Sequence, residues 1–229
     1  MNIQRVVNGI CDGCGLAADS VNGLCESCCA HLPWLQGVCA CCARPQITST
    51  IYCGDCIKHR PGFDRVICPL HYSGHVQRLV TSLKFGHSLW VAQTLAELMW
   101  LRLGAADEGM LARPNVALIP VPAQRDRLRD RGFSPAAEIA RCIAKLAGVS
   151  VRTDITSRLG ARPAQSGLSS RAARRDNVRG VFKSIRKAPK TVVVIDDVLT
   201  TGATADALAV ALLASGAESV SIWVAARAG

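Results

Sequence analysis

The chain has 229 residues, of which 49% are hydrophobic and 4% aromatic, and it carries a formal net charge of +10. This length suits one α/β domain plus a small module, and the hydrophobic share excludes an intrinsically disordered chain. No apolar run is long enough to cross a bilayer, and no apolar signal core precedes Cys11, so the sequence predicts a cytoplasmic protein without membrane insertion.

Cysteine dominates the first quarter of the chain. Eight of the twelve cysteines form four C-x2-C pairs, and ten residues separate each pair from the next. The pairs are Cys11/Cys14, Cys25/Cys28, Cys39/Cys42 and Cys53/Cys56. In a cytoplasmic chain this spacing favours metal ligation over disulfides, because two such pairs complete a tetrahedral zinc site.

The unit C-x2-C-x10-C-x2-C therefore occurs twice, with an offset of 28 residues. We predict two structural zinc ions in two tandem ribbons, which together make a double zinc-ribbon module at residues 1–58. The alternative is an interleaved arrangement, in which the first pair joins the third and the second joins the fourth. All-cysteine sites leave no position for a catalytic water, so this zinc supplies folding energy.

Residues 59–112 follow as a linker or hood region that contains helix. A short strand is predicted at 66–72, and a helical pattern covers 75–103 with an interruption near 84–88. The segment 104–114 is predicted to be a connection.

The remaining residues, 113–229, alternate between strand and helix patterns. Strands are predicted at 116–119, 149–153, 181–185, 190–195 and 220–225, and helices at 135–146 and 203–213. The stretch 157–177 is polar and basic, and we predict a long loop there. Alternating strands and helices favour a parallel sheet flanked by helices, so the predicted fold class is α/β.

One segment of this last region indicates a ligand. The apolar run 191–195 ends in Asp196 and Asp197, and a turn, Thr200-Thr201-Gly202-Ala203-Thr204, leads into a predicted helix. Such a turn offers N–H groups and hydroxyls to a phosphate, while two carboxylates accept ribose hydroxyls or hold a hydrated Mg²⁺. The segment resembles the phosphoribosyl-pyrophosphate (PRPP) signature of type I phosphoribosyltransferases. An ATPase would need a GxxxxGK[ST] loop, which the sequence lacks.

The positive charge is concentrated outside the cysteine-rich module. Residues 1–56 hold two arginines and four carboxylates, a balance of −2, so the remainder carries +12. Residues 158–190 alone hold ten lysines or arginines and one acid. This suggests a polyanionic partner such as nucleic acid. The alternatives are that the basic residues form only a solvated face, or that they bind only the phosphates of PRPP. The candidate nucleic-acid contacts are Arg171, Arg174, Arg175 and Arg179.

Three features together resemble the competence protein F (ComF) family, whose members pair a cysteine-rich N-terminus with a phosphoribosyltransferase-like domain. They are the double zinc ribbon, the stretches Ile119-Pro120-Val121-Pro122 and Arg131-Gly132-Phe133-Ser134, and Gln165 … Arg174 … Asn177-Val178-Arg179-Gly180-Val181-Phe182 before the PRPP signature. The resemblance covers nearly the whole chain. Ser134-Pro135 departs from the usual Asn-Gln of the family, which affects expected contacts near the pyrophosphate loop.

The resemblance implies a type I phosphoribosyltransferase-like sheet in residues 113–229 and assigns roles to the candidate residues. Asp196 and Asp197 would contact the ribose hydroxyls and favour a positively charged sugar in the transition state, while residues 200–204 would bind the 5′-phosphate. Mg²⁺ would bridge the pyrophosphate and the ribose. The pyrophosphate loop would include Val121, Pro122 and Ala123, assisted by Arg125 or Arg131.

Two classes of function stay open at this point. In the preferred class, the chain is a ComF-like protein that binds PRPP with Mg²⁺ and single-stranded DNA, and it acts in DNA uptake with proteins of the uptake machinery. In the other, it is a metabolic phosphoribosyltransferase that acts on a nucleobase or a small amine. The sequence does not decide whether the chain catalyses transfer from PRPP or only binds it.

Overall fold

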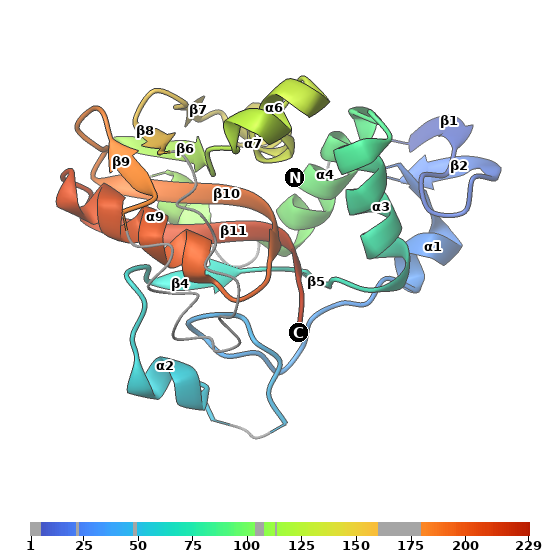
Figure 1. Ribbon diagram of the computed structural model, residues 1–229. Coiled ribbons are helices and arrows are strands. Elements are labelled where there is room, and N and C mark those ends of the chain that lie inside the picture. The colour runs from blue at the N-terminus through green and yellow to red at the C-terminus, as the bar shows by residue number, and fades with distance from the viewer. Residues whose placement is uncertain (1–5, 22, 48–49, 104–107, 113, 160–179) are drawn as a thin grey trace.

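The computed structural model describes residues 6–21, 23–47, 50–103, 108–112, 114–159 and 180–229 (Figure 1). The helices are α1 (Glu26–Ala30), α2 (Gly54–Lys58), α3 (Gly74–Phe85), α4 (Trp90–Leu103), α5 (Glu108–Leu111), α6 (Arg125–Arg131), α7 (Pro135–Ala147) and α9 (Ala203–Ala214). The strands are β1 (Val6–Ile10), β2 (Ala17–Val21), β3 (Leu24–Cys25), β4 (Arg65–Ile67), β5 (Leu70–His71), β6 (Val116–Pro120), β7 (Ser150–Val151), β8 (Thr156–Arg158), β9 (Phe182–Ser184), β10 (Thr191–Leu199) and β11 (Ser219–Arg227).

A parallel sheet forms the centre of the molecule. Its strand order is β4-β11-β10-β6-β7, and β5 pairs with the end of β11. Every one of these pairs is parallel. The sheet buries β10 between β6 and β11, which explains why its first five residues are an unbroken β-branched run. The α/β fold class predicted from the sequence is confirmed.

Alternate residues of β10 face two different cores. Val192 and Val194 pack in one core with Leu208 of α9, whereas Val193 and Ile195 belong to a second core with residues of α3, α4 and α7. Successive side chains of a strand point to opposite faces of its sheet. One face is therefore covered by α9, and the other by the three helices α3, α4 and α7 (Figure 1).

The two cysteine-rich units lie at different places around this sheet. In Figure 1 the first unit, with β1, β2 and α1, stands beside α3, whereas α2 of the second unit lies at the bottom below β4. Cys11 and Cys28 of the first unit share a small core with Val76 of α3. Cys39 and Cys53 of the second unit belong to the core that α9 covers. Each unit is thus packed against a different part of the parallel-sheet region.

Several element boundaries differ from the prediction. The strand predicted at 66–72 is two short strands, β4 and β5, separated by Cys68 and Pro69. Pro69 has no N–H group for a strand ladder, which accounts for the interruption. The connection predicted at 104–114 contains α5.

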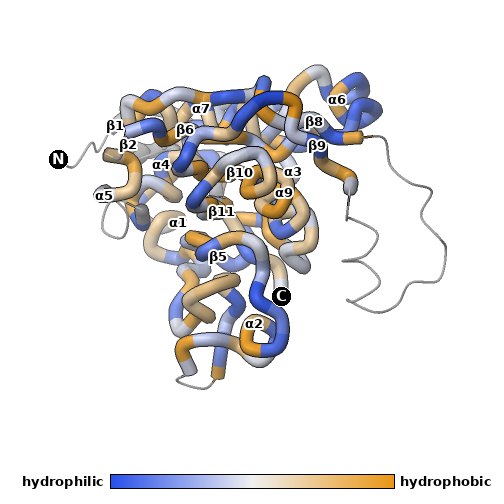
Figure 2. Tube along the Cα trace, turned by 90° about the vertical axis from the view of Figure 1, so that its left-hand side faces the viewer, coloured by the Kyte–Doolittle hydropathy of each residue, from blue (hydrophilic) through white to orange (hydrophobic). Residues whose placement is uncertain are grey.

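The region between the predicted strands also holds more structure than expected. No element is predicted where α6 lies, because its sequence RDRLRDR has no apolar stripe; Figure 2 shows this helix largely in hydrophilic blue. The loop predicted at 157–177 starts within β8, which pairs antiparallel with β9. Residues 160–179 of that loop lie outside the described residues. Within the described ranges, no helix has the length and apolar character needed to cross a membrane.

Candidate functional site

The acidic pair lies where β10 loses one of its two neighbours. Pairing of β10 with β6 ends at Ile195 and Pro120, while pairing with β11 continues to Leu199. The strand predicted to end at residue 195 therefore runs four residues further, through both aspartates. The N–H of Val121 donates to the carbonyl oxygen of Ile195 at 2.9 Å. This bond brings the start of the predicted pyrophosphate loop next to the acidic pair.

The two carboxylates differ in their electrostatic surroundings. Asp197 is 8% exposed, and its Oδ1 lies 2.7 Å from Nζ of Lys84 in the last turn of α3. Burial raises the pKa of Asp196 to about 7, and the charge of Asp197 adds to that rise. Three groups lower the pKa of Asp196 in turn. The N–H of Asp197 donates to Oδ1 of Asp196 at 2.9 Å, and the charges of Lys84 and Arg158 favour the ionised carboxylate. Near neutral pH Asp196 is therefore only partly ionised.

The turn after β10 presents a helix N-terminus. Gly202 adopts a left-handed conformation with φ of 82°, and it precedes α9 without a side-chain cap. The N–H of Ala203 donates to Oγ1 of Thr201 at 3.3 Å. The first N–H groups of a helix have no intrahelical acceptor, and the helix dipole favours an anion beside them. The structure therefore places an anion-compatible turn two residues beyond the acidic strand segment.

A buried arginine that no motif indicates holds this turn. Arg227, the last residue of β11, is 2% exposed. Its Nη1 donates to the carbonyl oxygens of Leu199 at 3.0 Å and Ala228 at 2.9 Å, and also to that of Thr200. The sequence signal that could have found it is a charged residue at the end of a predominantly apolar strand.

The residues predicted for the pyrophosphate loop follow β6 and lead into α6. Val121 is buried, and Pro122 and Ala123 are half-buried. Arg125 begins α6 and is exposed, while Arg131 ends it. These two arginines therefore lie at opposite ends of one helix.

Arg131 connects that helix to the end of α3. Its guanidinium carbon lies 5.1 Å from the ring centroid of Phe85, the residue after Lys84. Cation–π contact of this kind brings the end of α6 close to the end of α3. The helix end that supplies Lys84 to the acidic pair is thus in contact with one of the predicted pyrophosphate-loop arginines.

Arg158 is a further cation near the acidic pair, and no sequence motif indicates it. It lies on β8, with its guanidinium carbon 5.5 Å from the ring centroid of Phe182. Burial lowers its pKa, as does the charge of Arg127, and the charge of Asp196 opposes both. Its buried Nε has no hydrogen-bond partner within the described part of the chain. The four arginines predicted to contact nucleic acid lie outside the described residues: Arg171, Arg174, Arg175 and Arg179.

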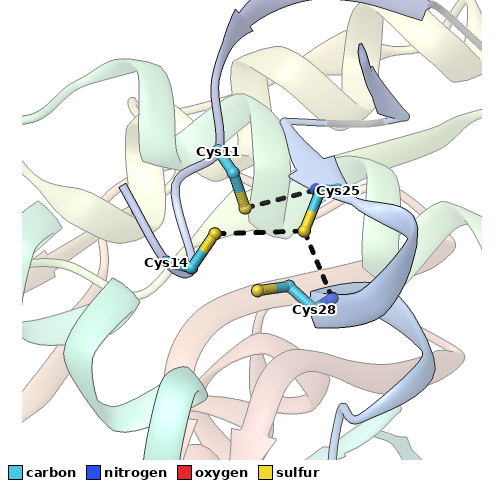
Figure 3. Close-up of side chains that lie close together, drawn as sticks. All are labelled: Cys11, Cys14, Cys25 and Cys28. Atoms are coloured by element: carbon cyan, nitrogen blue, oxygen red, sulfur yellow. Dashed lines mark hydrogen bonds between the residues drawn. The ribbon is translucent and has the colours of Figure 1, made fainter. Parts of the chain in front are cut away.

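The cysteines form two separate clusters of four. Cys11, Cys14, Cys25 and Cys28 point toward one another (Figure 3), and their Sγ atoms all lie within 4.8 Å of one another. The other cluster, of Cys39, Cys42, Cys53 and Cys56, meets the same limit. The structure thus groups neighbouring pairs, as the tandem arrangement requires, and does not interleave them.

The sulfur spacing suits a tetrahedral metal. The Sγ atoms of Cys14 and Cys25 are 3.9 Å apart, and those of Cys42 and Cys53 are 3.6 Å apart. A tetrahedral zinc ion with Zn–S bonds of ~2.3 Å would separate its sulfurs by about 3.8 Å. Each cluster could therefore hold one structural zinc ion.

Backbone N–H groups stabilise the thiolate form of one cysteine in each cluster. The N–H groups of Cys25 and Gly13 donate to Sγ of Cys11 at 3.2 and 3.3 Å. Burial opposes the charged form of Cys11, but the backbone N–H groups of Cys25, Cys14 and Gly13, together with the Cys14 thiol, outweigh it and lower its pKa to about 6. Cys39 behaves alike, with burial outweighed by backbone N–H groups and a pKa of about 7. Burial, with neighbouring thiols, raises the pKa of Cys28 to about 12, so a full set of four thiolates needs a cation to stabilise it.

Comparison with known proteins identifies relatives over most of the chain. It is 30% identical over 181 residues to Competence protein F of Haemophilus influenzae, which covers 77% of this chain and 79% of that protein. It is 29% identical over 185 residues to DNA utilization protein YhgH of Escherichia coli O157:H7, covering 80% and 81%. YhgH of Salmonella typhi is 29% identical over 182 residues, covering 76% and 77%. No model of a protein family matches the chain.

Proposed function

The chain belongs to the competence protein F family, and we propose that it acts in DNA uptake or utilisation by binding PRPP with Mg²⁺ and, separately, single-stranded DNA. The names of its relatives, Competence protein F and DNA utilization protein, support a role that involves DNA. PRPP, Mg²⁺ and single-stranded DNA are inferred from the residues of this chain and from the family resemblance.

A single observation carries the PRPP part of the proposal. The acidic strand segment with Asp196 and Asp197 is followed directly by a turn whose helix N-terminus is suited to a phosphate. In the proposed complex, residues 200–204 bind the 5′-phosphate and the two carboxylates accept the ribose hydroxyls. The two carboxylates also offer the hard oxygen ligands that Mg²⁺ prefers, and a bound Mg²⁺ would neutralise part of the pyrophosphate charge.

The cysteine clusters are proposed to hold two zinc ions with a purely structural role. All eight ligands are thiols, and soft thiolates select zinc over Mg²⁺. Since the first cluster packs on α3 and the second on the core under α9, each zinc would fix a different segment of the N-terminal quarter to the sheet.

The DNA part of the proposal rests on charge. Ten lysines or arginines against one acid in residues 158–190 form a strongly basic stretch that would attract a polyphosphate backbone. We propose that Arg171, Arg174, Arg175 and Arg179 supply such contacts.

Calorimetric titration with PRPP, with and without Mg²⁺, tests the ligand. We expect Asp197→Asn to weaken binding at least tenfold, because it removes a charge that the proposed complex uses. Asp154→Asn is the matched control, since Asp154 is also in an ion pair, with Arg152, but lies outside the proposed site. Equal affinities of wild type and Asp197→Asn would exclude the assigned ribose contact.

Fluorescence anisotropy with a labelled single-stranded oligonucleotide tests the DNA partner. We expect binding that weakens steeply with salt and is lost when Arg174 and Arg175 are both changed to glutamate. An absence of DNA binding at low salt, together with pyrophosphate release from PRPP in the presence of a nucleobase, would favour the metabolic alternative instead.

A further inference from the structure

Lys84 brings a cation to the acidic pair from outside the PRPP signature. Its Nζ lies 2.7 Å from Oδ1 of Asp197, and the two side chains are only 25% and 11% exposed. Lys84 reaches Asp197 from α3, which covers the face of the sheet that holds Val193 and Ile195. The pair therefore joins α3 to the edge of the sheet at the candidate site.

The local structure of α3 fixes where this ammonium group can reach. Leu79, Val80 and Leu83 are buried in the core beneath the helix, which sets its rotation. Gly86 ends the helix, and a Cβ there would come within 2.9 Å of the carbonyl oxygen of Ser82. A side chain at 86 would thus collide with the last turn that carries Lys84.

The position of Lys84 has a consequence for any cation that approaches Asp197. An ammonium at 2.7 Å already neutralises this carboxylate and occupies one of its oxygens. A divalent cation on the same carboxylate would meet the repulsion of that ammonium at close range. An anionic ligand lowers this repulsion, because its phosphates give the ammonium an alternative partner.

We propose that Lys84 is a ligand-binding residue of the site, whose ammonium competes with the divalent cation for Asp197 and pairs with the phosphates when cation and phosphosugar arrive together. The proposal rests on the proposed function. Lys84 then suppresses binding of the cation alone and favours joint binding of cation and PRPP. Lys84 thereby couples the binding of the cation and PRPP positively, so that each raises the affinity for the other about tenfold, as is usual for linked sites.

The test compares wild type with Lys84→Met in the zinc-loaded full chain. The first arm measures binding of Mn²⁺ alone, as a paramagnetic substitute for Mg²⁺, by electron paramagnetic resonance. The second arm measures binding of PRPP in excess Mg²⁺ by calorimetry. We expect Lys84→Met to bind Mn²⁺ alone about tenfold more tightly and PRPP about tenfold more weakly.

Three further variants make the result interpretable. Lys84→Arg keeps the positive charge and should behave like wild type in both arms. Lys84→Gln is a second neutral variant, which can still donate to Asp197 and so preserves the contact if Lys84→Met folds poorly. Lys145→Met is the matched control, because Lys145 is also in the last turn of a helix but is exposed. It should leave both affinities unchanged.

The outcomes separate this inference from the function on which it rests. If wild type fails to bind PRPP, the proposed function is wrong. If wild type binds PRPP but neutral variants at residue 84 do not show both opposite shifts, the role of Lys84 is wrong and the proposed function stands. A lower melting temperature with unchanged affinities would mark the ion pair as structural only, and it would overturn the proposal.

Discussion

Replacement of Arg227 by methionine should loosen the turn on which the proposed phosphate site depends. The guanidinium is almost fully buried and donates to the carbonyl oxygens of Leu199, Thr200 and Ala228. Methionine fills a similar volume but donates no hydrogen bond. The carbonyl oxygen of Leu199 would keep the N–H of Ala228 as a donor at 2.9 Å, whereas the carbonyl oxygen of Thr200 would lose the guanidinium that donates to it.

The size of the effect follows from the number of carbonyls that lose a donor. A buried polar group left without its partner costs about 1–3 kcal/mol. Because Leu199 keeps a backbone donor and the half-buried Ala228 can bond water, one carbonyl counts, that of Thr200, and the free energy of unfolding should fall by about 2 kcal/mol. For a chain of this length, that loss corresponds to a fall in melting temperature of about 4–8 °C.

Differential scanning fluorimetry of the zinc-loaded protein measures the change in melting temperature. Calorimetry measures PRPP binding, which should weaken at least tenfold because the turn is no longer held. Arg102→Met is the matched control: Arg102 also donates to a backbone carbonyl, that of Leu35, but is exposed. Its effect should stay within about 0.5 kcal/mol. If Arg227→Met melts within about 2 °C of wild type and binds PRPP equally well, Arg227 does not hold the turn.

Three other changes probe the rest of the molecule. Gly202→Ala should lower the free energy of unfolding in urea by about 1–2 kcal/mol, because residue 202 has a φ of 82°. Gly54→Ala, where a Cβ meets no atom within 4 Å, should be nearly neutral. Similar losses in both variants would disprove strain at the turn. Metal analysis should find two zinc ions per wild-type chain and one in either Cys14→Ser or Cys42→Ser, and loss of both ions from a single variant would contradict independent clusters. The raised pKa of Asp196 means that the folded state binds its proton more tightly than the unfolded state, so this residue lowers stability progressively as pH rises from about 4 to about 7. Asp196→Asn should therefore gain stability relative to wild type across that window, as measured by urea unfolding, and a difference that does not vary with pH would rule out the assigned shift.

The sequence was sufficient for features that depend on local spacing. The regular C-x2-C pairs predicted two metal-binding units, and their register along the chain already favoured the tandem grouping that the structure shows. The β-branched run before Asp196 predicted a buried parallel strand, because only such a strand is apolar on both faces. Helix α7 was equally clear, since Ser134 caps it and Pro135 occupies its first position.

Local patterns were insufficient where a neighbouring strand or a charge decided the outcome. The strand β10 continues beyond Ile195 because β11 still pairs with it, and periodicity carries no information about that partner. Helix α6 escaped prediction because it has no apolar face. The predicted nucleic-acid contacts around Arg174 stay a prediction, since they lie outside the described residues.

The sequence alone thus determined the α/β class, the two sets of four thiols and the acidic segment followed by its turn, because each is encoded by residues near one another in the chain. Only the tertiary structure decided which distant side chains meet that segment. Lys84 arrives from α3, Arg158 from β8 and Arg227 from the end of β11. Sequence periodicity cannot assign these partners, because their positions depend on how helices and strands far apart in the chain pack around one sheet edge.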